Sequence, residues 1–82
     1  MDIKDLLSKE IKDASPLYMT MAQYAANQCT GCSDSLMILA YKAQQAMLEA
    51  HKNGENPIQR LNDFLGTSIP EDVLLSLISD NQ

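Results

Sequence analysis

The sequence predicts an all-α protein, a small bundle of four to five helices around one long central helix at about residues 34–52. Three observations predict this fold class. Apolar residues recur at steps of three and four, which places them on one face of an α-helix. The three glycines and three prolines fall between these periodic segments. No stretch alternates apolar and polar residues as a β-strand does, and 82 residues suit a single domain, so we expect one helical domain over residues 1–82.

The central helix has one face of mostly small apolar residues and one polar face. The apolar residues are Leu36, Ala40, Ala43, Met47 and Ala50. The polar residues are Lys42, Gln45, Glu49 and Lys52. Residues 36–41 contain no charged or strongly polar side chain, so we expect other helices to surround this half of the helix.

The alanines of the central helix predict a close helix contact, within one chain or between two chains, because they leave little side-chain bulk. The three alanines of the central helix are Ala40, Ala43 and Ala50. Their expected counterparts in the preceding helix are Ala22, Ala25 and Ala26.

Two helices precede the central helix. Asp2 can cap the first helix, over residues 3–13, because its side chain can accept a hydrogen bond from a free helix amide. Ser15 and Pro16 predict a boundary, since proline disfavours helical angles at the residue before it and fits the first turn of a new helix. The second helix, over residues 16–28, has no charged side chain, which predicts that it is mostly buried.

Two short helices follow the central helix. We expect Ser33 and Asp34 to cap the central helix and Gly54 to mark its end. Asn56 is the expected cap of a fourth helix over residues 57–65. Its inward side chains are Ile58, Leu61 and Leu65.

The last helix follows Gly66, which ends the fourth. Ser68 and Glu71 have the spacing of a capping box, in which the two residues satisfy free amides at the helix start. This helix runs to about residue 79. Its expected buried residues are Val73, Leu74, Leu77 and Ile78.

The charge of the chain excludes nucleic acids and membranes as partners. The net charge is −5 and the pI is near 4.5, whereas phosphate backbones and anionic lipids bind clustered lysine and arginine. Residues 61–78 resemble the helix-turn-helix of DNA-binding repressors, but the helix that would enter the groove carries Glu71 and Asp72 and no basic residue. The longest apolar run has six residues, far short of the roughly 18 of a membrane span. Without a signal-peptide pattern, we expect a cytoplasmic protein with reduced cysteines.

Cys29 and Cys32 form the sharpest local motif, Cys-Thr-Gly-Cys, at the expected start of the central helix. A helix N-terminus favours a thiolate, so in a thiol-disulfide reaction Cys32 would attack and Cys29 would resolve. The motif resembles the redox-active pair of alkylhydroperoxidase-D-like all-α proteins, in which a histidine follows the second cysteine by a few residues. Here Leu36 stands in that region and the only histidine is His51. The structural alternative is two small apolar side chains that fill a tight turn.

The sequence contains no complete catalytic or metal-binding set, so we expect no enzyme activity, no cofactor and no metal. Zinc needs four ligands, and Cys29, Cys32 and His51 supply three. About 28 Å of continuous helix would separate Cys32 from His51. We therefore expect His51 to face solvent in the last helical turn, where a positive charge is favourable.

Methionines and tyrosines on the second helix and the central helix are candidates for a contact surface, because thioethers and amphipathic rings make adaptable interfaces. They are Tyr18, Met19, Met21, Tyr24, Met37, Tyr41 and Met47. A domain of this size can hide about three of them, and we expect the others to form a surface patch.

The acidic excess lies in residues 54–82, which hold five acidic residues against Arg60 alone. An acidic surface attracts a basic partner, and a core this small favours self-association. The sequence therefore favours a non-enzymatic protein-binding regulator, of the inhibitor or adaptor type, that also forms homo-oligomers. The alternative is a thiol-disulfide redox protein that uses Cys29 and Cys32. The candidate partner-binding residues are Tyr18, Met19, Tyr41, Glu55, Asp63, Glu71 and Asp72.

Overall fold

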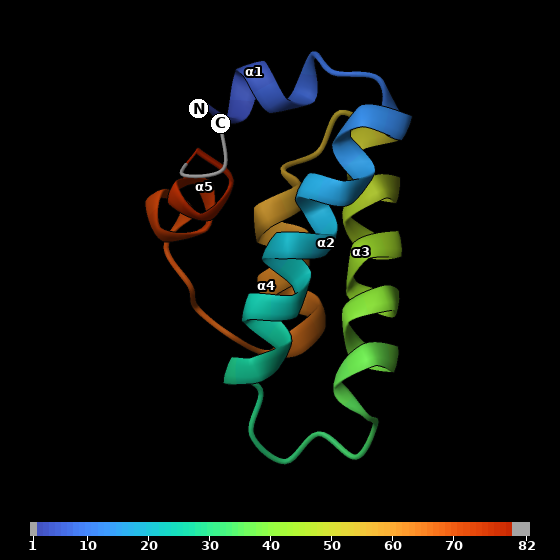
Figure 1. The fold of residues 1–82 in the computed structure, drawn as a ribbon, viewed down its shortest axis with the longest axis vertical. Helices are drawn as coiled ribbons and strands as arrows, with labels where there is room; N and C mark the ends of the chain where they lie inside the picture. The colour runs from blue at the N-terminus through green and yellow to red at the C-terminus, as the bar shows by residue number, and fades with distance from the viewer. Residues whose placement is uncertain (1, 80–82) are drawn as a thin grey trace.

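The computed structural model describes residues 2–79, which form five α-helices (Figure 1). The helices are α1 (Ile3–Leu7), α2 (Ile11–Gln28), α3 (Leu36–Lys52), α4 (Pro57–Leu65) and α5 (Glu71–Ser79). Residues 2–79 contain no β-strand, so the predicted all-α bundle is confirmed.

Two long helices, α2 and α3, form the frame of the bundle. They run side by side in opposite directions, and the loop that joins them lies at one end of the long axis, the bottom of Figure 1. α4 packs against both of them, and α5 packs against α2. α1 lies at the opposite end of the bundle from this loop (Figure 1). α2 therefore contacts three other helices, whereas α3 lies along one side of the bundle.

Both α2 and α3, which pack against each other, carry buried alanines. The six alanines are all buried: Ala22, Ala25, Ala26, Ala40, Ala43 and Ala50. The buried amide of Gln44 also joins the two helices, because its Nε2 donates to the carbonyl oxygen and to the hydroxyl of Ser15, both at 2.8 Å. The predicted alanine contact thus lies within one chain.

The predicted helix boundary at Pro16 is wrong. α1 ends at Leu7, and α2 runs from Ile11 through Pro16 without a break. Asp2 does precede α1, but its side chain makes no capping hydrogen bond. A proline inside a helix lacks the N–H that would bond to the carbonyl four residues earlier, here that of Lys12. Both residues are exposed, so water can satisfy that carbonyl, and the helix continues because it buries side chains before and after the proline, Ala14 and Tyr18.

The start of α3 also differs from the prediction. Its cap is Ser35, whose hydroxyl accepts a hydrogen bond from the N–H of Ile38 at 3.4 Å, whereas Ser33 and Asp34 lie before the cap. Four of the residues 36–41 are exposed, so the prediction that other helices surround them is wrong. The reason is length, because the nine residues of α4 span about 13 Å and the 17 residues of α3 about 25 Å.

The predicted bounds of α4 are confirmed at both ends. Oδ1 of Asn56 accepts hydrogen bonds from the N–H groups of Ile58 and Gln59, at 2.9 and 3.2 Å. Gly66 follows the helix with a φ of +68°, a left-handed conformation that glycine adopts without steric cost. The inward residues are buried as expected: Ile58, Leu61 and Leu65.

One side chain, Asn62, fixes the connection between α4 and α5. Its Nδ2 donates to the carbonyl oxygen of Ile69 at 2.9 Å, and its Oδ1 accepts from the N–H of Ile69 at 3.0 Å and from the hydroxyl of Thr67 at 2.8 Å. α5 then begins at Glu71, so the predicted cap, Ser68, lies outside the helix. The buried residues of α5 are Leu74, Leu75 and Ile78, while Val73 and Leu77 are half-buried.

Candidate functional site

The first half of α3 carries a cluster of exposed apolar side chains. The exposed fractions are 65% for Met37, 49% for Ile38 and 58% for Tyr41, and we refer to these three residues as the apolar face. Leu36, at the start of α3, is 42% exposed but lies in line with the buried Ala40 and Ala43 on the other side of the helix. Single exposed apolar residues are common on proteins, whereas contiguous groups mark contact sites for other molecules. The apolar face is therefore the strongest candidate for a functional surface.

The sequence analysis named Met37 and Tyr41 as candidates for a contact surface but missed Ile38, although the sequence contains a signal for it. Lys42 and Gln45 belong to the polar face of the helix, and residues four positions earlier share that face, which gives Ile38 and Tyr41. The outward side of α3 is thus apolar in its N-terminal half and polar in its C-terminal half. The predicted lengths of the helices already implied that α4 is too short to cover it.

Charged residues are almost absent around the apolar face. Asp34 and Lys42 are the only charged residues between positions 14 and 48. They form an ion pair in which Nζ of Lys42 lies 3.5 Å from Oδ2 of Asp34. Their side chains remain 43% and 55% exposed, for Asp34 and Lys42 respectively, so both can also meet another molecule.

The seven methionines and tyrosines that were candidates for a contact surface include three buried residues, the number expected from the size of the domain. Three of the seven are fully buried: Tyr18, Met21 and Met47. Met19 and Tyr24 are half-buried, and Met37 and Tyr41 are exposed. The burial of Tyr18 contradicts its place among the candidate contact residues, because a partner cannot reach a fully covered side chain.

His51 does not face solvent as predicted. It is half-buried, its Nδ1 lies 2.8 Å from the hydroxyl oxygen of Tyr18, and the two rings meet edge to face at 5.8 Å between centroids. Burial raises the pKa of Tyr18 to about 12, because the phenolate would lose its hydration. This pair belongs to the core, and no sequence pattern pointed to it, since the two residues are 33 positions apart.

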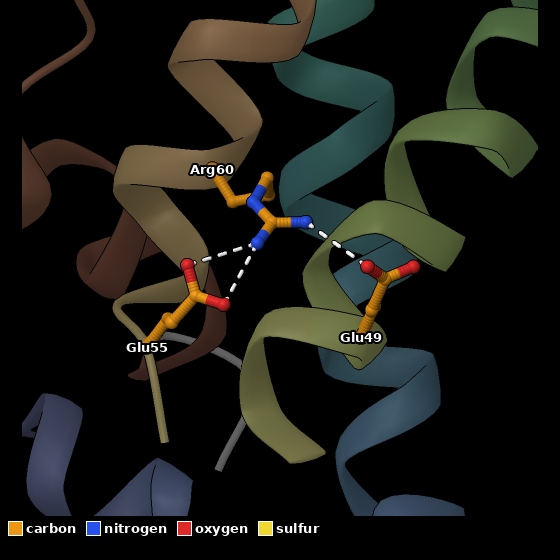
Figure 2. A network of polar contacts seen from close by, with 3 residues as sticks. All are labelled: Glu49, Glu55 and Arg60. Carbon is orange, nitrogen blue, oxygen red and sulfur yellow. Dashed lines mark hydrogen bonds and ion pairs between the residues drawn. The ribbon is translucent and has the colours of Figure 1, made fainter. Parts of the chain in front are cut away.

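Glu55 is committed to an ion-pair network (Figure 2). Nη2 of Arg60 lies 2.9 Å from both carboxylate oxygens of Glu55, and Nη1 lies 3.6 Å from Oε1 of Glu49. The Arg60 guanidinium, by hydrogen bonding and by its charge, lowers the pKa of Glu55, and the carboxylate raises the pKa of Arg60 in turn. The network joins α3, α4 and the turn between them, so the negative charge of Glu55 is largely neutralised.

The other acidic candidates remain exposed. Asp63 and Glu71 line one shallow groove of about 400 Å³ beside the α4–α5 connection, together with Asn62, Thr67 and other residues of that connection. Glu71 and Asp72 also occupy the first turn of α5, where free helix amides favour negative side chains. The structure thus brings Asp63 and Glu71 together and gives Glu71 and Asp72 a structural role as well.

Cys29 and Cys32 form a disulfide, where we had expected two thiols. Cys29 follows the last residue of α2 and is half-buried, with its sulfur 3.7 Å from the carbonyl oxygen of Leu65. Cys32 is exposed and lies four positions before Leu36, the first residue of α3. The predicted placement of Cys32 at a helix N-terminus is therefore wrong, and helix amides do not reach its sulfur in the way that thiolate stabilisation needs.

Neither a metal site nor a membrane span emerges from the part of the chain that the structure describes. Residues 2–79 contain no group of three or more histidine, cysteine, aspartate or glutamate side chains that could hold a metal ion. No helix in the same range is long and apolar enough to cross a bilayer. Comparisons with known protein families, with curated proteins and with solved structures gave no match.

Proposed function

We propose that this protein is a non-enzymatic protein-binding regulator, of the inhibitor or adaptor type, and that the apolar face of α3 is its contact surface. The observation that carries the proposal is the exposure of three large apolar side chains, Met37, Ile38 and Tyr41, on a helix whose other side is packed into the core. A partner that covers such a surface gains about 25 cal/mol for each Å² of apolar area removed from water. The residue types suit this role, since methionine adapts to different shapes and tyrosine offers a large, rigid contact area.

The acidic residues supply a second, weaker contribution to binding. Asp63, Glu71 and Asp72 are exposed and can attract a basic partner over a distance of about 10 Å at 0.1 M salt. Glu55 contributes less, because Arg60 already neutralises it. Met19, half-buried on α2, contributes at most the edge of a contact.

Photo-crosslinking in the native cell tests the proposal. A photo-reactive amino acid replaces Tyr41 in one variant and Gln23, which is exposed on α2, in a matched control. We expect the probe at position 41 to crosslink to one protein, identified by mass spectrometry, that the probe at position 23 does not reach. Equal crosslinking from both positions contradicts a contact at the apolar face.

The identified partner is then titrated with purified variants. Met37→Lys and Tyr41→Lys should each weaken binding about tenfold or more, because truncating or charging a central contact costs about 1.4 kcal/mol or more. Gln23→Lys makes the same change in charge outside the face and should leave affinity unchanged. Unchanged affinity in both face variants, with the fold intact, contradicts the proposal.

A thiol-disulfide activity is the second candidate function, and the exposed position of Cys32 in the disulfide favours it. In such a reaction a substrate thiolate attacks the sulfur of Cys32, and the bond to Cys29 breaks so that Cys29 leaves as a thiolate and takes a proton from water. A second substrate thiolate then displaces Cys32, which leaves the substrate oxidised and both cysteines reduced. Iodoacetamide labelling of the reduced protein across pH tests this, since a Cys32 thiol with an ordinary pKa of about 8.5 removes its chemical basis.

A further inference from the structure

We propose that the apolar face of α3 pairs with the same face of a second copy of this chain, antiparallel, about a two-fold axis near Ile38. The inference rests on the proposed function, because it names an occupant for the same contact surface. Pairing of this kind uses one patch twice, as the commonest homodimers do. A heterologous partner then competes with self-association for the same three side chains.

The distribution of charge favours a second copy at this place. Residues 14–48 carry one acidic and one basic residue, so the net charge of −5 resides in residues 1–13 and 49–82. Two copies that approach through those charged parts repel each other. The N-terminal half of α3 lies next to the loop at the bottom of Figure 1, away from α1, and there two copies meet without net charge.

The two charged residues of this region are placed for self-pairing. Ile38 and Lys42 are four positions apart on α3, whereas Asp34 lies just before the helix cap, Ser35. The ion pair between Asp34 and Lys42 places both charged groups along the same side of the helix. In an antiparallel pair with its two-fold axis at Ile38, Lys42 of one copy lies beside the segment that precedes Ile38 in the other copy, and Asp34 belongs to that segment. Asp34 of one copy therefore faces Lys42 of the other, and Lys42 faces Asp34.

In this pairing an Asp34–Lys42 pair between the two copies lies on each side of the apolar centre at Ile38. Each carboxylate can exchange its own lysine for that of the other copy or bind both. Three partly exposed apolar side chains per copy make a contact well below the roughly 1,200–2,000 Å² of a stable complex. We therefore expect a dimer that forms and dissociates with protein concentration.

Charge reversal tests this arrangement by sedimentation velocity under non-reducing conditions. The unmodified chain should shift from the 9.1 kDa monomer toward a dimer as its concentration rises. Asp34→Lys and Lys42→Asp should each raise the dissociation constant about tenfold, because each sets like charges opposite one another twice. Lys12→Asp is the control, since it makes the same change in charge in an exposed ion pair with Glu10.

Two combinations identify the antiparallel register. An equimolar mixture of Asp34→Lys and Lys42→Asp chains should dimerise like the unmodified protein, because every facing pair is again of opposite sign. The double variant Asp34→Lys/Lys42→Asp should recover in the same way and also keeps an ion pair within the chain. The pairing is overturned if the unmodified chain stays monomeric, if its dimer ignores both single reversals, or if the mixture does not recover.

The result that would contradict the proposed function differs from the result that would contradict self-pairing. A chain that is monomeric at every concentration, and whose partner binding still falls with Tyr41→Lys, overturns the pairing and leaves the function supported. Partner binding that survives both Met37→Lys and Tyr41→Lys overturns the function, whatever the mass of the chain.

Discussion

The imidazole of His51, at the end of α3, contacts Tyr18 of α2 through one ring nitrogen and Lys9 of the α1–α2 connection through the other. Nδ1 lies 2.8 Å from the Tyr18 hydroxyl oxygen, and Nε2 lies 3.1 Å from the carbonyl oxygen of Lys9. A carbonyl oxygen only accepts, so Nε2 carries a proton, and in the neutral ring Nδ1 accepts the hydrogen bond that Tyr18 donates. The last turn of α3 thereby holds both α2 and the α1–α2 connection.

Tyr18→Phe should lower the free energy of unfolding by about 1 kcal/mol, because it removes the hydroxyl and leaves Nδ1 of His51 without its donor. Urea unfolding measures the change. Tyr41→Phe is the matched control, since it removes the hydroxyl of an exposed tyrosine. Equal stabilities of the two variants would contradict a stabilising role for the contact.

Alkaline pH should destabilise the protein through Tyr18. Its pKa is raised to about 12 in the folded state, so the folded chain keeps a proton that the unfolded chain, with a tyrosine pKa of about 10, gives up. The stability from the neutral phenol is complete below pH 10 and is lost as the pH rises toward 12, by at most about 3 kcal/mol. Unfolding of the unmodified protein and of Tyr18→Phe across this range isolates the effect, and parallel curves for the two would refute it.

Ala43→Leu should destabilise the fold by about 1–3 kcal/mol, because it forces extra volume into the buried contact of α2 with α3. Gln45→Leu adds a leucine to the exposed side of the same helix and should change stability little. Thermal unfolding of both variants provides the measurement. If Ala43→Leu leaves the melting temperature unchanged, Ala43 is not tightly packed between α2 and α3.

Glu55→Gln should reduce stability at neutral pH, and the difference should vanish in acid. Arg60 lowers the pKa of Glu55 in the folded state, so its contribution is present above the ordinary glutamate pKa and is lost as the pH falls through the lowered value. Added salt should also shrink the difference, because the pair is exposed. Asp63→Asn, which removes an exposed acid on α4, serves as the control in urea unfolding at several pH values. A difference independent of pH would rule out the ion pair as its source.

The features predicted most closely from sequence are those with local causes. Asn56, Pro57 and Gly66 each act on backbone groups within a few residues, so the bounds of α4 follow from them directly. Pro16 had the same kind of local signal, but burial on both sides of it kept α2 intact. Local preference decides an element only where tertiary packing does not outweigh it.

The features that sequence reasoning missed depend on distant residues. His51 is 33 positions from Tyr18 and 42 from Lys9, so nothing near it in sequence indicated its burial. Ile38 was not among the predicted contact residues, because its exposure depends on where α4 stops alongside α3. Predicting the site therefore requires knowledge of how the helices are arranged, whereas predicting the helices themselves requires mainly the apolar periodicity and the capping residues.

The two hydrogen bonds between the Asn62 side chain and the backbone of Ile69 fix the number of residues in the connection between α4 and α5. The amide reaches the N–H and the carbonyl of a residue seven positions later, so adding or deleting one residue between them would bring the wrong residue to it. Surface connections usually accept insertions, fused tags and new chain ends. Residues 66–70 are an exception, and a fusion partner inserted there would separate α5 from α2, against which it packs.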